Sequence, residues 1–239
     1  MKMLGLVLLA ACVDPGGDEL VVRWRDSSTR CSVVELEDAV DAGALRIDFT
    51  GGDQVTLRRA CDGDPVIVAT REQPELVLPE GVAFAFAAHQ SLAIEAGPGV
   101  EVDSIAVTIT PREHATATAV VTHVALPAIA VGVNAAVVEA GTIAMVAPLD
   151  AATYVAFVGH THRYGTGVRI AITTDAITDR IPVYLPIDFA WAAPPTQVIG
   201  PLAMPGGGRF YVQCAYYNTG TTPVTDELCG FWAYTAMPR

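Results

Sequence analysis

Alternation with a period of two runs through most of this sequence, and it restricts the chain to β structure. Apolar and polar residues alternate in stretches that are typical of strands with one buried face. These stretches are 45–49, 54–60, 66–71, 84–96, 103–110, 117–126, 141–149, 153–162, 167–174, 208–218 and 227–235. Turn sequences such as "LPEG" and "MPGGG" separate them. The sequence therefore predicts an all-β protein made of antiparallel β-sandwiches.

Helical periodicity is almost absent. The stretch "SVVELEDAVDAGA" at 32–44 is the only one that we interpret as a short helix. A domain boundary is predicted near "TPREHAT" at 110–116, where a proline ends a strand and charge increases. We expect two sandwich domains, 20–112 and 113–239, and a single larger jelly roll is the alternative.

The N-terminal segment 1–19 is interpreted as an export signal followed by a tether. "MKMLGLVLLAAC" places a lysine and a short apolar run before a cysteine, and it is too short to span a bilayer. Leu9-Ala10-Ala11-Cys12 resembles a bacterial lipobox, which implies cleavage before Cys12 and lipidation of its thiol. The alternatives are an ordinary signal peptide or a cytosolic protein with an apolar start. We expect an exported lipoprotein, anchored to a membrane and facing the periplasm or the cell surface.

Charge and lysine content exclude two classes of function. The formal net charge is −12 and the pI is about 4.7, which argues against a nucleic-acid partner because phosphate binding needs a basic face. Lys2 is the only lysine, so the mature chain has no amine nucleophile for Schiff-base chemistry.

Four cysteines remain if Cys12 carries a lipid, and four cysteines permit three pairings. The local pairings are Cys31 with Cys61 and Cys214 with Cys229, each joining two neighbouring strands. Disulfides are the expectation for an exported chain, and free buried thiols are the alternative.

Two of the five histidines, His160 and His162, lie one residue apart in the strand-like segment 153–162. Residues two apart in a strand point to the same face, so we expect Tyr154, Ala156 and Val158 to share that face with both histidines. Two imidazoles on one face can bind a single Cu, Zn, Fe or Ni ion. Surface or structural histidines are the alternative.

The neighbouring segments carry a resemblance to a known family. "FVGHTHRYGTGVRI" at 157–170, "RFYVQCAYYNTG" at 209–220 and "TDELCGFWAY" at 225–234 are similar, in this order, to the C-terminal domain of the copper type II, ascorbate-dependent monooxygenases. The resemblance implies two stacked antiparallel jelly-roll sandwiches.

The resemblance also implies site residues and partners. It places His160 and His162 on ligands of a substrate-side copper, and Cys214 and Cys229 on the disulfide beside that copper. It places His89 on one ligand of a second, electron-transfer copper. O₂ and an external electron donor such as ascorbate are the implied partners.

The sequence departs from the family at both copper sites. Leu228 stands where the family has a methionine ligand, and no adjacent histidine pair occurs for the second copper. We therefore expect a single copper and a lost second site. His114 is interpreted as solvated, and His123 as a histidine at the edge of the core that is hydrogen-bonded through one nitrogen.

The function expected from the sequence is that of an exported lipoprotein with a copper-binding, monooxygenase-like domain. From the resemblance, we expect this domain to hydroxylate a C–H bond with O₂ at one copper ion held by the His-x-His pair. The alternatives are a non-catalytic metal-binding lipoprotein and a structural or adhesive surface protein in which the site is degenerate.

Overall fold

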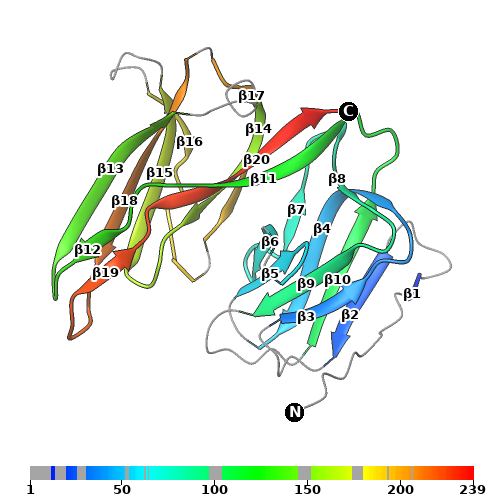
Figure 1. Ribbon diagram of the computed structural model, residues 1–239, viewed down its shortest axis with the longest axis horizontal. Helices are drawn as coiled ribbons and strands as arrows, with labels where there is room; N and C mark the ends of the chain where they lie inside the picture. The colour runs from blue at the N-terminus through cyan, green and yellow to red at the C-terminus, as the bar shows by residue number, and fades with distance from the viewer. Residues whose placement is uncertain are drawn as a thin grey trace. The chain divides into compact units, whose positions relative to one another are not determined.

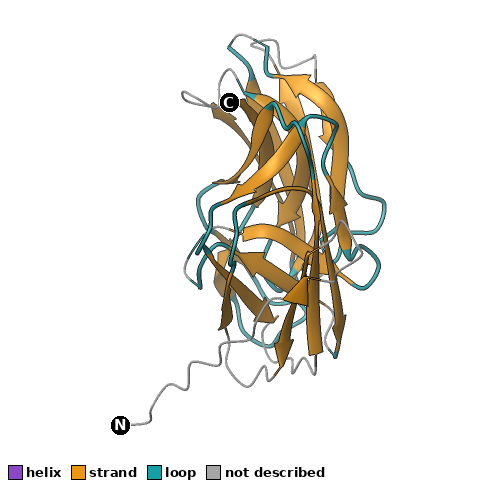
Figure 2. Cartoon of the chain, turned by 90° about the vertical axis from the view of Figure 1, so that its right-hand side faces the viewer, coloured by secondary structure: helices purple, strands orange, loops and turns teal. Residues whose placement is uncertain are grey.

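The protein is all-β in the computed structural model. The model describes residues 12–13, 20–25, 31–51, 54–61, 63, 65–96, 104–144, 152–173, 180–192, 194–205 and 207–239. These residues form strands, turns and loops and no helix (Figure 2). The predicted fold class, antiparallel sheets in β-sandwich units, is confirmed.

The chain divides into two compact units. The first consists of Met1–Val77 with Ala83–His114, and the second of Leu78–Val82 with Ala115–Arg239. The main division therefore lies within two residues of the predicted boundary between 112 and 113. The prediction did not include the short segment 78–82 in the second unit.

Antiparallel strands of the first unit form two sheets (Figure 1). One sheet has the order β1-β2-β10-β4-β8, with β7 also paired to β4. The other has the order β3-β9-β5-β6. The strands are β1 (Cys12–Val13), β2 (Leu20–Arg25), β3 (Cys31–Glu35), β4 (Val40–Thr50), β5 (Gln54–Arg58), β6 (Pro65–Thr70), β7 (Glu75–Val77), β8 (Val82–Phe86), β9 (Ser91–Ala96) and β10 (Ser104–Pro111).

The second unit contains the candidate site, and its strands form two four-stranded sheets and one two-stranded sheet. The four-stranded sheets have the orders β11-β20-β14-β17 and β13-β18-β15-β16, and β12 pairs with β19. The strands are β11 (Ala117–Ala125), β12 (Ile129–Val131), β13 (Ala136–Ala144), β14 (Thr153–His160), β15 (Gly165–Thr173), β16 (Arg180–Tyr184), β17 (Thr196–Ala203), β18 (Arg209–Tyr217), β19 (Val224–Glu227) and β20 (Gly230–Pro238).

Strand β18 illustrates why these residues form a sandwich. Phe210, Val212, Cys214 and Tyr216 are all buried, and the residues between them are more exposed. This alternation places every second side chain in the core of the second unit, where aromatic rings from both four-stranded sheets meet. For example, the Phe210 ring lies 5.0 Å from that of Phe231 on β20, at an interplanar angle of 72°.

Three details of the predicted secondary structure are wrong. The stretch 32–44 is not a helix, because most of β3 and the start of β4 occupy it. The stretch 84–96 is not one strand, because a turn at 87–90 separates β8 from β9. Strands β1, β2, β7, β12, β16 and β17 were not predicted at all.

Candidate metal centre

His160 is the last residue of β14, in a sheet where β20 lies between β14 and β11. A register irregularity between Tyr154 and Ala156 interrupts the pairing of β14 with β20. Tyr154 therefore packs in the core beside Phe157, with ring centroids 5.8 Å apart, and it does not share the face of His160. The expectation of one face for residues 154–162 is wrong at Tyr154, because a bulge reverses the alternation.

His123 on β11 is a third imidazole beside His160. The Nδ1 atom of His160 lies 2.9 Å from the Nε2 atom of His123, which is a hydrogen bond between two imidazole rings. The ring centroids are 4.9 Å apart. His123 is partly buried and its ring is hydrogen-bonded at Nε2, and its partner is a predicted metal ligand.

The indole of Trp232 on β20 packs against both of these imidazoles. Its ring centroid lies 4.2 Å from that of His123 and 5.6 Å from that of His160. Trp232 and His123 are direct cross-strand partners in the pairing of β20 with β11. The indole is therefore part of the apolar wall of the histidine cluster and restricts the rotation of both rings.

His162 lies just beyond β14, in the turn that leads to β15, and not on the strand as predicted. Its Nδ1 atom donates a hydrogen bond of 2.7 Å to the main-chain carbonyl of Asp226. A carbonyl can only accept, so the proton is on Nδ1, and in the neutral form of this exposed ring Nε2 carries the lone pair. A carbonyl partner of this kind commonly orients a metal-binding histidine.

The turn that contains His162 is hydrogen-bonded to a buried carboxylate. Glu227 is 2% exposed, and its Oε1 atom accepts a hydrogen bond of 3.3 Å from the backbone N–H of Tyr164. Burial raises the pKa of the Glu227 carboxyl, and this N–H and the nearby His162 ring oppose the rise. Glu227 thus helps to fix the turn and places an acidic group close to His162.

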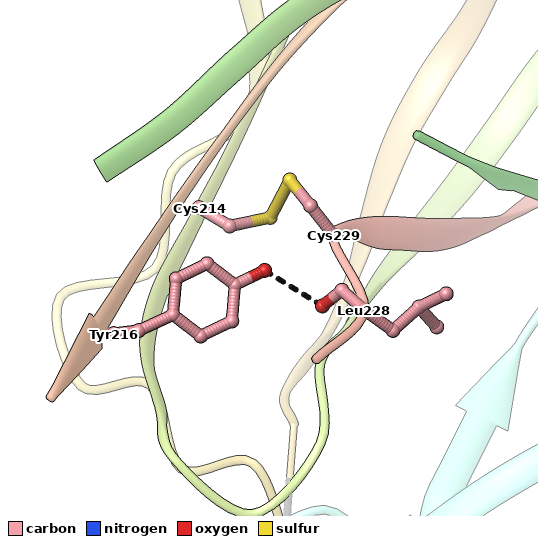
Figure 3. The surroundings of a disulfide bond; sticks show 4 residues. All are labelled: Cys214, Tyr216, Leu228 and Cys229. Carbon is pink, nitrogen blue, oxygen red and sulfur yellow. Dashed lines mark hydrogen bonds between the residues drawn. A yellow bond between two sulfur atoms is a disulfide. The ribbon is translucent and has the colours of Figure 1, made fainter. Parts of the chain in front are cut away.

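A disulfide joins Cys214 to Cys229 (Figure 3). Cys229 lies two residues after the end of β19, the strand that contains Asp226. The Cα atoms are 5.6 Å apart, so this predicted pairing is confirmed. It joins β18 of one sheet to the residue before β20 of the other, and not two neighbouring strands as expected. A disulfide indicates an oxidising, extracytoplasmic environment.

Beside the disulfide, Tyr216 makes a second connection between β18 and the segment before β20. Its hydroxyl donates a hydrogen bond of 2.7 Å to the main-chain carbonyl of Leu228 (Figure 3). Burial raises the pKa of this hydroxyl, so it stays protonated and remains a donor. The Leu228 side chain extends away from the disulfide and supplies no donor atom for a metal (Figure 3).

The other predicted histidines lie in the first unit. His89 is in the turn between β8 and β9 at φ 60°, and its Nδ1 atom is 3.0 Å from Oε1 of Glu35. The side chain of His114 is 95% exposed, as its interpretation as solvated requires. His89 therefore has a carboxylate partner, and its assignment as a copper ligand stays a prediction.

Several predictions near the N-terminus concern side chains or segments outside the described residues. The export signal, the lipobox and most of the tether fall on 1–11 and 14–19. Cys12 is described only as part of β1, without its side chain. Cys61 is disulfide-bonded, but the side chain of Cys31 is not described, so that pairing stays a prediction. In the described part of the chain, no helix is long and apolar enough to cross a membrane.

The donor chemistry of the cluster fits copper or zinc better than it fits the cuprous site of the resembled family. Two imidazoles that hold one ion do so with metal–nitrogen bonds of about 2.0–2.1 Å. The His160 and His162 centroids are 5.9 Å apart. Across the described residues, however, no three His, Cys, Asp or Glu side chains are already arranged as a metal-binding group.

Comparisons with known proteins do not assign the chain to a family. The sequence matches no protein-family model and no curated protein. Similar solved structures include the STIV MCP, at 10% identity and a TM-score of 0.39, covering 90% of this chain and 96% of that chain. The turret protein A223 of Sulfolobus turreted icosahedral virus has 12% identity and a TM-score of 0.24, with coverages of 92% and 97%.

A third similar structure is a β-porphyranase of glycoside hydrolase family 86 from Bacteroides plebeius. It has 11% identity and a TM-score of 0.26, and the match covers 96% of this chain and 36% of that chain. Because these sequence identities and TM-scores are low, the similarities support no inference about function.

Proposed function

We propose that the second unit binds one copper ion through His160 and His162. The observation that carries this proposal is the hydrogen bond from Nδ1 of His162 to the Asp226 carbonyl, which leaves the Nε2 lone pair available for a metal. The His160 ring lies next to that of His162, with ring centroids 5.9 Å apart. The net charge of −12 favours a cation.

The ligand types favour the cupric ion. Imidazole nitrogen binds Cu(II) well, whereas Cu(I) is stabilised by soft sulfur ligands such as a methionine thioether. Leu228 replaces that thioether, and the Cys214 and Cys229 sulfurs are joined in a disulfide. A site of this kind holds Cu(II), and we propose that binding or transferring copper is its main role.

We further propose that the protein is exported and attached to a membrane through a lipid on Cys12. The Cys214–Cys229 disulfide supports export, and the segment Leu9–Cys12 supports lipidation. Mass spectrometry of the mature N-terminus tests this step. A mature chain that begins at Cys12 with added acyl mass is expected, and an unmodified Cys12 contradicts it.

A monooxygenase activity is the second candidate function, because the disulfide pairs the two cysteines that the family resemblance requires. Copper held by the histidines would provide the place where O₂ reacts. The reaction inserts one oxygen atom into a substrate C–H bond and reduces the other to water. That reduction consumes two protons and two electrons, which an external donor such as ascorbate supplies.

Copper binding is tested with the purified protein and its His160→Ala/His162→Ala variant. Wild type loaded with Cu(II) is expected to show nitrogen hyperfine splitting in electron paramagnetic resonance. The double variant is expected to lose this splitting, with at least tenfold weaker Cu(II) binding, because both imidazole donors are absent. His114→Ala is the matched control, since the His114 side chain is 95% exposed and lies in the first unit.

Two results decide between the functions. Equal and weak Cu(II) binding by wild type and the double variant would disprove copper binding and leave a structural or adhesive role. If copper binds, ascorbate-dependent O₂ consumption is measured with the same proteins. Consumption that the double variant loses supports the monooxygenase, and its absence in wild type leaves binding or transfer of copper.

A further inference from the structure

The His123–His160 contact suggests a larger site than the His-x-His pair. We propose that His123 is the third protein ligand of the metal, so that three imidazoles take the place of the two imidazoles and thioether of the resembled family. This inference depends on the proposed copper binding at His160 and His162. It assigns a metal role to a residue that sequence patterns place only at the edge of the core.

The distance between the facing nitrogens is the first argument. Two nitrogen ligands on one ion, at bonds of about 2.0–2.1 Å, lie about 3.0–3.4 Å apart. Nδ1 of His160 and Nε2 of His123 are 2.9 Å apart. The separation of the two nitrogens therefore needs to grow by only a few tenths of an ångström. For a metal to replace the hydrogen bond, both rings must also turn so that their lone pairs point at the ion, and the shared proton must move to another ring nitrogen or to water.

The arrangement of strands provides the second argument. His123 and His160 are on β11 and β14, which are both paired to β20, so about 9–10 Å separates their backbones. Gly230 on β20 is the cross-strand partner of His160 and also of Ala125, two residues beyond His123. Because Gly230 has no side chain, the imidazole of His160 can reach across β20 toward His123.

Close packing explains why a side chain at position 230 is excluded. A Cβ atom at Gly230 would lie 2.7 Å from the carbonyl oxygen of Val124 and 2.9 Å from the Cβ atom of Ala125. The absence of a side chain at Gly230 therefore allows β11 to pack close to β20. It also allows the His123 and His160 rings to contact each other over β20.

Trp232 provides the third argument, because it holds the rings in position and serves as a reporter. Its centroid lies within 4.2 Å of the His123 ring and 5.6 Å of the His160 ring. An apolar indole beside the pair limits access of water, which strengthens metal–ligand interactions. Paramagnetic Cu(II) bound at these rings would quench the fluorescence of Trp232.

The test uses the full chain with Trp24→Phe and Trp191→Phe, so that Trp232 is the only tryptophan. Cu(II) is expected to quench its fluorescence, and competition with glycine as a chelator gives the affinity. His123→Phe in this background keeps an aromatic ring against Trp232. It is expected to weaken Cu(II) binding about tenfold and to reduce by one the number of coordinated nitrogens seen by electron paramagnetic resonance.

A second measurement needs no variant of His123. Zn(II) is added to the ¹⁵N-histidine-labelled wild-type chain, and the ring nitrogen resonances are recorded by NMR. The resonances of His123, His160 and His162 are expected to shift together, with those of His114 unchanged.

Each outcome separates the two proposals. If His123→Phe keeps both affinity and nitrogen count, or if the His123 resonances stay in place while those of His160 and His162 shift, the third ligand is disproved and copper binding stands. If wild type shows neither quenching by Cu(II) nor any histidine shift with Zn(II), both proposals are wrong.

Discussion

Replacing Cys214 and Cys229 together by alanine is expected to lower the free energy of unfolding by about 3 kcal/mol, because a disulfide that closes a loop of 15 residues restricts the unfolded chain by about that amount. Both cysteines are fully buried, so the lost packing adds to the effect. Urea unfolding followed by circular dichroism measures the change. Cu(II) affinity is expected to fall as well, because Asp226 lies only three residues before Cys229 and its carbonyl orients His162.

Tyr216→Phe is the matched control for the disulfide. It removes only the hydrogen bond to the Leu228 carbonyl and leaves the bridge intact, so a loss of about 1 kcal/mol is expected. A cysteine double variant that loses no more stability than Tyr216→Phe would contradict the assigned role of the bridge. Unchanged copper affinity at reduced stability would show that the Asp226 carbonyl keeps its position without the disulfide.

Structural features that depend on the local alternation of apolar and polar residues could be predicted from the sequence. The alternating residues at 208–218 predicted a strand, and β18 confirms it. The Cys214–Cys229 pairing followed from cysteine spacing and from the family resemblance, and it is confirmed. These features depend on residues close in sequence, where the side-chain pattern is sufficient.

The helix predicted at 32–44 is wrong because the apolar residues of this stretch fit both a helical and a strand period. Val34 and Leu36 are buried, while Val33 is 42% exposed and Glu35 is exposed. This is the period of a strand, and β3 follows it as far as Glu35. The error arose because Val34, Leu36 and Val40 also fit an irregular helical stripe, and short apolar stretches fit both periods.

The part of the site that the sequence did not predict depends on pairing between distant strands. His123 lies 37 residues before His160, and it reaches the cluster only because β11 pairs with one edge of β20 and β14 with the other. The bulge in β14 was equally hidden, since an extra residue in a strand leaves no signal in composition. Strand order and register are non-local properties, so a single sequence did not define the third histidine.

Gly165→Ala is expected to lower the free energy of unfolding by about 3 kcal/mol and to weaken Cu(II) binding. A Cβ atom at position 165 would overlap the side chain of Thr161, which is only 3% exposed and has no space to move away. The turn from Thr161 to Gly165 would have to open. His162 lies inside this turn, and the backbone N–H of Gly165 donates to the His162 carbonyl at 3.1 Å.

Gly167→Ala is the matched control, because a Cβ atom there meets only the Cβ atom of Ala215, at an ordinary contact distance of 3.8 Å. Both variants add one methyl group to β15, and they differ in whether the turn that carries His162 must move. Urea unfolding and Cu(II) titration of both variants separate the two effects. A similar small loss in both would show that the turn tolerates a side chain at 165, whereas a large loss confined to Gly165→Ala ties the position of His162 to the packing of Thr161 against a glycine.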